Sequence, residues 1–135
     1  DSVSANTSSL PSSYDARSDS LMTDVKNQKP YGTCWAFSAI SSAETSLINN
    51  GVSVNGTTAT ASNLDLSELQ LLYFFYHSVT DSLGGTAGDS TTPLTSNYLN
   101  QGGNGIFTTF VLASWVGVTE ESEADYDEAS TSLTL

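Results

Sequence analysis

The chain has 135 residues, of which 38% are hydrophobic, so it is long enough for one modest globular domain with a buried core. Fifteen acidic residues against three basic ones give a formal net charge of -12, which repels phosphate backbones and anionic lipids, so we expect no nucleic-acid partner. No stretch has the roughly eighteen apolar residues of a membrane span, and one cysteine excludes internal disulfides and cysteine-based zinc sites; we expect no membrane insertion, metal or cofactor.

The first predicted elements are an arm and a helix. Residues 1 to 13 are rich in serine and threonine, which predicts an extended N-terminal arm. Thr33 is the expected cap of a helix that runs from about 34 to 50, and Gly51 is expected to end it. The apolar residues of this helix recur at three- and four-residue spacings: Ala36, Phe37, Ile40, Ala43, Leu47 and Ile48.

A loop and a second helix follow. Residues 52 to 63 predict a polar loop, with a short hairpin at Asn55-Gly56. Ser67 and Gln70 form a capping box, which predicts the start of the next helix. Residues 69 to 76 are almost all large and apolar, so we expect most of this helix to be buried.

The last third of the chain is less regular. Residues 80 to 97 have no apolar period and several breakers, which predicts a long irregular loop. A third helix is predicted from about 105 to 115, with Gly117 at its end. The acidic segment from Glu120 to Glu128 is interpreted as a solvated or linker segment.

The stretch NQKPYGTCWAFS, residues 27 to 38, contains the only cysteine. A lone cysteine in an apolar helix is most often a structural residue. Cys34, however, would lie in the first helical turn, where the helix dipole stabilises a thiolate. The side-chain amide of Gln28 and the N–H of Cys34 could then donate to an oxyanion, and Gly32 would let the loop turn back; otherwise Gln28 is a surface polar residue.

Several motifs, in this order, resemble those of papain-family cysteine peptidases. They are Leu10-Pro11, Asp15-Ala16-Arg17, Val25 to Gln28, Gly32 to Phe37, Ser67-Glu68 and Gln101-Gly102-Gly103. The match extends from about residue 10 to Tyr126, which makes it specific. The resemblance implies an α+β papain-like fold, of which this chain is the mainly α-helical N-terminal half. Its expected parts are an arm (1–13), a helical half-domain (14–128) and the start of a linker (129–135) to a missing β-rich half.

The resemblance also assigns roles to individual residues. Cys34 would be the nucleophile and Gln28 the oxyanion donor. Gly102 and Gly103 would hold an extended peptide through main-chain hydrogen bonds, although a bare glycine pair is more often a flexible turn. The full set of expected substrate-binding residues is Trp35, at the floor of the cleft, with Gly102, Gly103 and Asn104.

The chain departs from the family pattern at several positions. Family members commonly have cysteines at the positions of Tyr31, Phe74 and Asn100, and a glycine at the position of Lys29. Both ends of the implied disulfide between positions 31 and 100 are replaced together, by Tyr31 and Asn100. We therefore expect packing to hold these segments together instead. These replacements favour a divergent branch, and the surrounding segments resemble secreted, surface-associated bacterial members.

A cysteine peptidase needs an imidazole base that an Asn or Asp orients. The only histidine, His77, ends the second predicted helix, and we interpret it as a helix C-terminal or packing residue. In the family the histidine belongs to the β-rich half, about 130–150 residues after the cysteine. We therefore expect the catalytic His and Asn to be missing from this chain.

The sequence thus predicts a cysteine endopeptidase of peptides or proteins, present as a half that is inactive alone. We expect it to be secreted or at the cell surface. A face around Cys34 that lacks its partner half is expected to self-associate. The alternative is a non-catalytic papain-like module that binds peptides or partners, although such a module needs neither Cys34 nor Gln28.

Overall fold

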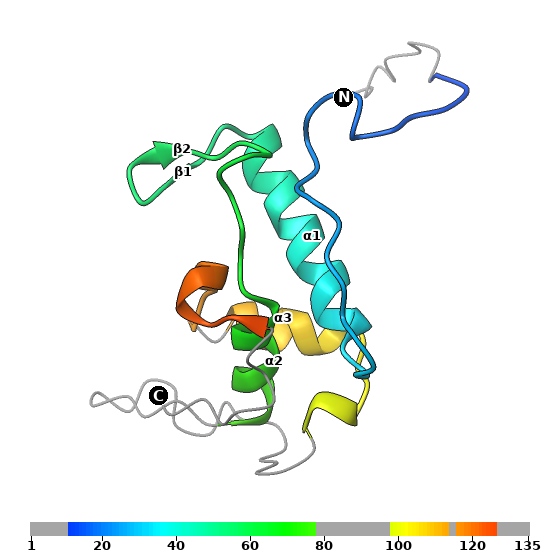
Figure 1. The fold of residues 1–135 in the computed structure, drawn as a ribbon, viewed down its shortest axis with the longest axis vertical. Helices are drawn as coiled ribbons and strands as arrows, with labels where there is room; N and C mark the ends of the chain where they lie inside the picture. The colour runs from blue at the N-terminus through cyan, green and yellow to red at the C-terminus, as the bar shows by residue number, and fades with distance from the viewer. Residues whose placement is uncertain (1–10, 78–97, 114–115, 127–135) are drawn as a thin grey trace, which may run out of the picture.

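A computed structural model describes residues 11–77, 98–113 and 116–126. The elements, in chain order, are α1 (Cys34–Asn49), β1 (Ser53–Val54), β2 (Thr57–Thr58), α2 (Glu68–Tyr76), the 3-10 helix η1 (Tyr98–Asn100), α3 (Gly105–Ala113) and the 3-10 helix η2 (Glu121–Glu123). Each of the three α-helices contacts the other two (Figure 1). The described part is mainly helical, which confirms the expected fold class.

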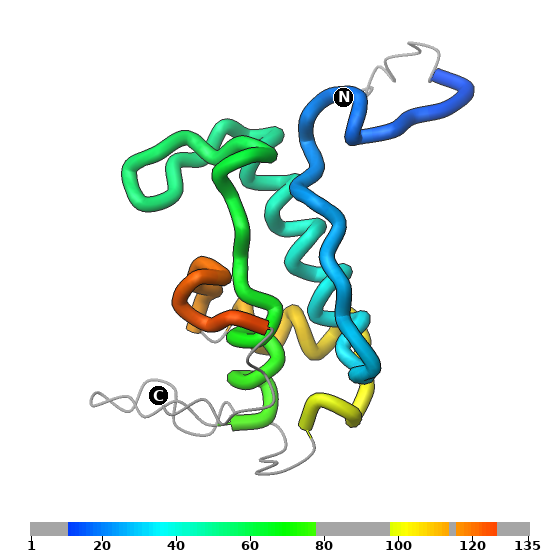
Figure 2. The backbone as a smooth tube through the Cα atoms, viewed as in Figure 1, coloured from blue at the N-terminus to red at the C-terminus, as the bar shows by residue number. Residues whose placement is uncertain are grey.

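Two extended segments flank α1 (Figure 2). The segment that leads into α1 runs beside it, with the hydroxyl of Thr45 3.4 Å from Sδ of Met22. The segment between the hairpin and α2 returns past the same helix, where the N–H of Leu66 donates to Oε1 of Glu44 at 2.8 Å. Because Glu44 also accepts from the hydroxyl of Thr23 at 2.5 Å, one buried carboxylate binds both segments to α1.

The start of α1 differs from the prediction in one respect. Thr33 is at the N-cap position, but its side chain makes no capping hydrogen bond. The hydroxyl of Thr33, which is fully buried, lies instead 2.6 Å from the hydroxyl of Tyr126. A side-chain partner from the end of the described chain therefore replaces the expected cap.

The end of α1 follows the sequence signal. Gly51 has a φ of +58°, in the left-handed region that favours glycine. Its N–H donates to the carbonyl of Ile48 at 3.1 Å, and the N–H of Val52 donates to that of Leu47 at 3.0 Å. These two bonds form a Schellman motif, which satisfies carbonyls at the helix end.

The predicted hairpin is present. β1 and β2 pair antiparallel, with Val54 opposite Thr57. Asn55 and Gly56 between them have φ values of +48° and +81°, as a type I′ turn requires. The short hairpin therefore follows from the Asn-Gly dipeptide.

The capping box at α2 is half formed. Oγ of Ser67 accepts from the N–H of Gln70 at 3.0 Å, as predicted. The reciprocal bond is absent, because the N–H of Ser67 donates to the carbonyl of Thr119 at 3.0 Å and the side chain of Gln70 accepts from the N–H of Thr119. The segment after α3 pairs here, as the bridge between Leu66 and Glu120 also shows, and it takes both partners.

The acidic segment is solvated only in part. Ala124 and Tyr126 are only 6% and 4% exposed. The carbonyl of Ala124 accepts from the hydroxyl of Ser67 at 2.6 Å, which holds the segment against the start of α2. Residues 120, 122, 123 and 125 are exposed as predicted, so the prediction of a solvated or linker segment is wrong only where Ala124 and Tyr126 pack into the domain.

Other predictions lie partly outside the described residues. These are the arm over residues 1–10, the loop at 80–97, the end of the third helix at 114–115 and the chain after residue 126. Residues 11–13 of the arm are exposed. No described helix is long and apolar enough to cross a membrane.

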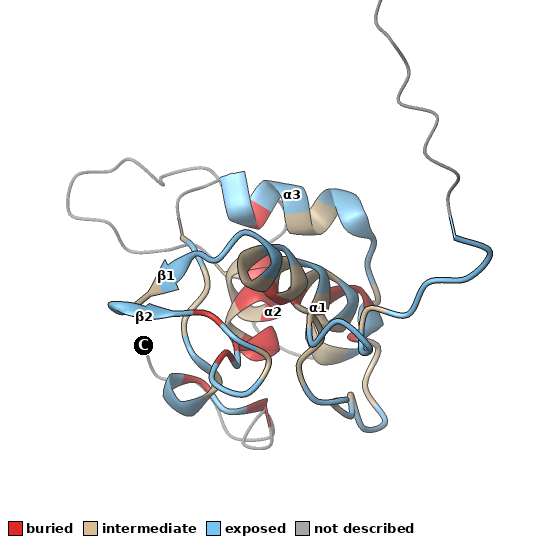
Figure 3. Ribbon diagram, turned by 90° about the horizontal axis from the view of Figure 1, so that it is seen from above, coloured by how far each residue is buried: buried red, intermediate tan, exposed pale blue. Residues whose placement is uncertain are grey.

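The core lies between α1 and α2, while the outer face of α3 is exposed (Figure 3). Ile106 and Phe110, one turn apart on α3, are 64% and 53% exposed. As predicted, most of α2 is buried. The core cluster comprises Trp35, Ala36, Ile40, Ala59, Leu64, Leu66, Leu69, Leu71, Leu72, Phe75, Tyr76, Val111 and Tyr126.

Candidate active site

Cys34 is the first residue of α1 and is exposed to solvent. At this end of a helix the first backbone N–H groups have no partner within the helix, and the helix dipole favours an anion. The side chain that follows, Trp35, is buried instead. The start of α1 therefore presents a thiol to solvent and anchors itself in the core through the next residue.

The loop before α1 is held by its own side chains. Nε2 of Gln28 donates to the carbonyl of Tyr31 at 2.8 Å. Lys29 has a φ of +55°, which is strained for a residue with a Cβ. Its N–H donates to Oδ1 of Asn27 at 2.8 Å, which stabilises the turn. The positive φ explains why a glycine is usual at this position in the family.

A second segment closes on this loop. The N–H of Gly32 donates to the carbonyl of Leu99 in η1 at 2.9 Å. A Cβ at Gly32 would lie 3.3 Å from the backbone nitrogen of Gly102. The two positions of the implied crosslink, Tyr31 and Asn100, each lie next to one partner of this hydrogen bond, so a backbone contact joins the two segments.

The glycine pair lies beside the start of α1. Gly102 has a φ of +70°, and its carbonyl accepts from the hydroxyl of Tyr76 at 3.1 Å. Gly103 contacts the indole of Trp35 so closely that a Cβ there would lie 2.6 Å from Nε1. Oδ1 of Asn104 accepts from the N–H of Ile106 at 2.9 Å, so this side chain caps α3.

Trp35 is enclosed by aromatic rings. Its ring centroid lies 5.6 Å from that of Phe75 and 5.7 Å from that of Phe107, both in edge-on geometry. Its Nε1 is buried and bonds no other described residue. The indole of Trp35 therefore packs directly against the backbone of Gly103. The expected contact of Trp35 with substrate stays a prediction.

The ring of His77 packs against two tyrosine rings. Its ring stacks on that of Tyr73, with centroids 3.8 Å apart, and Nδ1 lies 2.9 Å from the carbonyl of Tyr73. Tyr98 packs edge-on against it at 5.1 Å. His77 is the C-cap of α2, which confirms the interpretation as a helix C-terminal packing residue.

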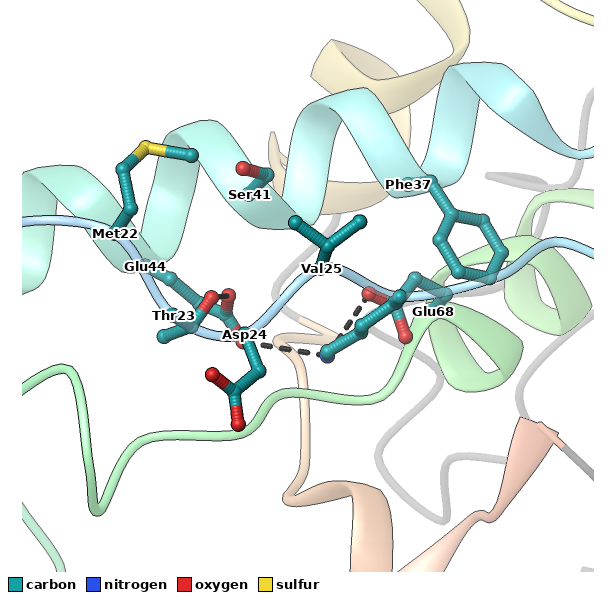
Figure 4. Close-up of a pocket in the computed structure, with 9 residues that line it drawn as sticks. Met22, Thr23, Asp24, Val25, Phe37, Ser41, Glu44 and Glu68 are labelled. Atoms are coloured by element: carbon teal, nitrogen blue, oxygen red, sulfur yellow. Dashed lines mark hydrogen bonds and ion pairs between the residues drawn. The ribbon is translucent and has the colours of Figure 1, made fainter. Parts of the chain in front are cut away.

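A charged cluster that the sequence did not predict lies between α1 and α2. Nζ of Lys26 lies 2.6 Å from Asp65, 2.9 Å from Glu68 and 3.5 Å from Glu44. A cavity of about 240 Å³ opens beside it, lined by side chains of the extended segment and of both helices (Figure 4). The sequence signal for this cluster was Glu44, a charged residue four positions after Ile40 on the buried face of α1.

Burial and charge act in opposite directions in this cluster. Burial raises the pKa of Glu68 from 4.5 to about 7, against the attraction of Lys26. Burial alone would lower the pKa of Lys26, but its bonds to Asp65 and Glu68 outweigh that effect and raise it. Lys26 is therefore held as a cation that joins three carboxylates.

In the described part of the chain, no group of three metal-ligating side chains is placed to hold a metal ion. The polar groups at the start of α1 and in the loop before it are a thiol, backbone N–H groups and the amide of Gln28. Such groups suit nucleophilic acyl transfer, in which a thiolate attacks a carbonyl and donors stabilise the oxyanion.

The family model of papain family cysteine proteases matches residues 10–131. The chain belongs to this family. Similar proteins include a KDEL-tailed cysteine endopeptidase of Arabidopsis thaliana, 49% identical over 39 residues, which are 29% of this chain and 11% of the relative. Fruit bromelain of Ananas comosus is 46% identical over 39 residues, again 29% and 11% of the two chains. Stem bromelain is 51% identical over 35 residues, which are 26% and 16%.

These matches cover less than a fifth of each relative's length. The family is established by the family model, and these short matches leave the chain's own substrate open. The relatives are plant proteins, so the expected likeness to secreted bacterial members finds no support among them. It stays a prediction.

Proposed function

We propose that this chain is the nucleophile-bearing part of a cysteine endopeptidase. The observation that supports this best is the placement of Cys34, exposed at the first residue of α1 and directly after the loop that carries Gln28. The thiolate would attack the carbonyl carbon of a peptide bond and form a thioester, while the C–N bond breaks and the amine leaves with the proton that a base had taken from the thiol. Water would then hydrolyse the thioester and free the thiol.

Gln28 is proposed as the oxyanion donor. Its amide nitrogen carries two hydrogens, and one is used by the carbonyl of Tyr31. The second is available for the oxygen that becomes negative as the thiolate attacks. The N–H of Cys34, at the start of the helix, is the second proposed donor.

The substrate main chain is proposed to lie along Gly102 and Gly103. Both residues lack a Cβ, and the backbone of Gly103 packs against the indole of Trp35. A peptide in extended form would pair with backbone groups there, as in strand addition. Asn104 follows directly and is exposed, so it would border the same surface.

The base is proposed to come from a second, β-rich half with a catalytic His and Asn. The support is that His77, the single histidine of the chain, is held by Tyr73 and Tyr98. On this proposal the 135-residue chain alone does not hydrolyse peptides. Without its partner half it would self-associate through the face around Cys34, which light scattering over a range of concentrations tests.

We also propose that the protein is secreted or displayed at a cell surface, with a bacterial source as the working expectation. The support is compositional, since only 13% of residues are charged and serine and threonine supply most polar positions. Separate detection in the medium, the surface fraction and the cell interior tests this. Protein confined to the interior would contradict it.

The alternative is a papain-like module that binds peptides or partners without cleaving them. The engagement of His77 favours it, because the chain alone then has no imidazole base. The exposed thiol and the bonded Gln28 amide favour the peptidase, since a binding module requires neither.

The test uses the full-length protein that contains this chain and a mixture of unstructured peptides. We expect cleavage that is lost in Cys34→Ser, and a fall in kcat of about 10²- to 10³-fold in Gln28→Ala. Asn49→Ala, an exposed amide at the other end of α1, is the matched control and should keep wild-type kcat. Binding without cleavage would support the alternative, and cleavage that survives Cys34→Ser would overturn the proposal.

A further inference from the structure

Tyr126 contacts both ends of the loop that carries Gln28. Its hydroxyl oxygen lies 2.9 Å from the carbonyl oxygen of Gln28 and 2.6 Å from Oγ1 of Thr33. A carbonyl can only accept, so Tyr126 donates its one proton to Gln28, and Thr33 in turn donates to the tyrosine oxygen. One buried hydroxyl therefore joins the two residues that bound the loop 28–33.

Tyr126 is itself held firmly. Its N–H donates to Oε1 of Glu121 at 2.8 Å. Its ring packs edge-on against Phe37 of α1, with centroids 4.8 Å apart, and the residue is 4% exposed. Burial raises the pKa of the Tyr126 hydroxyl, so it remains a donor at neutral pH. The Tyr126 hydroxyl is thus fixed in position and protonated, so it can donate to the loop.

The position of the Gln28 side chain depends on the loop backbone. Its amide bonds the carbonyl of Tyr31, three residues further along the same loop. Gly32 fixes one part of the loop to Leu99, and Tyr126 fixes the two ends. If the hydroxyl were removed, the carbonyl of Gln28 would lose this partner, and the amide would lose its fixed direction.

We propose that Tyr126 is a positioning residue of the peptidase, which fixes the loop so that the Gln28 amide points to the oxyanion formed beside Cys34. The inference rests on the proposed function, because it assigns Gln28 that role. Tyr126 itself touches no substrate and acts through Gln28. Small errors in the placement of such a donor cost large factors in rate.

The central test is Tyr126→Phe in the full-length protein, which keeps the ring against Phe37 and removes the hydroxyl. We expect kcat to fall about tenfold, with KM changed by less than about twofold, because the oxyanion exists only in the transition state. A double-mutant cycle with Gln28→Ala provides the second readout. In the Gln28→Ala background, Tyr126→Phe should reduce kcat by less than about threefold, since the amide it positions is gone.

Tyr76→Phe is the matched comparison. Tyr76 is also 4% exposed, and its hydroxyl also donates to a backbone carbonyl, that of Gly102. Because Gly102 lies on the proposed substrate strand, we expect this variant to raise KM and leave kcat near wild type. Similar melting temperatures for the two Phe variants would show that their kinetic difference does not come from general loss of structure.

Thr33 supplies a second test that does not alter Tyr126. Thr33→Ser keeps the hydroxyl that donates to Tyr126 and should retain kcat, whereas Thr33→Val should lower it several-fold. This pair keeps the inference testable if Tyr126→Phe does not fold. Equal kcat in the two Thr33 variants would count against the inference.

The outcomes separate the two proposals. A fall in kcat that disappears in the Gln28→Ala background supports the positioning role. An equal fall in both backgrounds, or no fall at all, overturns it while leaving the peptidase proposal intact. Cleavage that survives Cys34→Ser overturns the peptidase proposal and, with it, the role assigned to Tyr126.

Discussion

A Cβ atom at Gly103 would lie 2.6 Å from Nε1 of Trp35, closer than a Cβ atom approaches a neighbouring side chain. The backbone at Gly103 therefore rests directly on the buried indole, and glycine is required there by packing. Gly103 is otherwise exposed, and the residue it rests on directly follows Cys34 in α1. Through this contact a core side chain fixes the position of the backbone along which the substrate is proposed to lie.

Gly103→Ala should consequently destabilise the protein. Overpacking of this kind costs about 1–3 kcal/mol of unfolding free energy, because either the indole or the backbone must move. Urea denaturation measures the loss. Movement of the backbone would also disturb peptide binding, so KM should rise in the full-length protein.

Gly105→Ala is the control for that prediction. A Cβ there meets no atom within 4 Å, and the residue begins α3. We expect little change, or a slight gain because alanine favours helix. Equal unfolding free energies for the two alanine variants would contradict the packing role of Gly103.

Glu68 should make stability depend on pH. Its pKa is about 7 in the folded protein against 4.5 ordinarily, so the folded state binds the proton more tightly than the unfolded state. The contribution of Glu68 is greatest below about pH 4.5 and is lost as pH rises towards 7. Over that window the unfolding free energy attributable to Glu68 should fall by up to about 3 kcal/mol.

Glu68→Gln removes this titration and tests the sign. The unfolding free energy of the variant minus that of the wild type should increase between pH 4.5 and pH 7. Glu123→Gln, an exposed carboxylate in η2, controls for the loss of one negative charge. A difference for Glu68→Gln that moves in the opposite direction would show that the attraction of Lys26 outweighs burial.

The features that the sequence predicted are local. The Asn55-Gly56 turn, the Gly51 helix end and the bond from Gln70 to Ser67 each involve residues a few positions apart. The start of α1 at Cys34 followed from the apolar period and the preceding loop. Neighbouring residues set these conformations, so a pattern in the sequence was sufficient.

The features that were missed join distant parts of the chain. Thr33 was expected to cap its own helix, yet its hydroxyl pairs with Tyr126, 93 positions away. Lys26 meets carboxylates from three later segments, including Glu44 and Glu68. No local period encodes such pairs; the hints were Glu44 on the buried face of α1 and an aromatic residue within an acidic run.

Ser67→Ala should cost more than a usual helix-cap substitution. Oγ of Ser67 accepts from the N–H of Gln70 and donates to the carbonyl of Ala124, and the second of these bonds is buried. Loss of the cap costs about 1 kcal/mol, and the unpaired carbonyl adds about 1–3 kcal/mol. Ser42→Ala removes an exposed hydroxyl that bonds the carbonyl of Ser38 within α1, and it should be neutral or slightly stabilising.

Lys29→Gly should stabilise the folded chain. Lys29 has a φ of +55°, a conformation that costs a residue with a Cβ about 1–2 kcal/mol and glycine almost nothing. The greater freedom of glycine in the unfolded chain offsets about 0.5–1 kcal/mol of that gain. A net gain of about 0.5–1 kcal/mol in unfolding free energy is expected, because the bond from its N–H to Asn27 is kept. Lys29→Ala separates backbone from side chain: it removes the charged group, keeps the Cβ and should not stabilise. If both variants stabilise equally, the lysine side chain and not the backbone is the source of the strain.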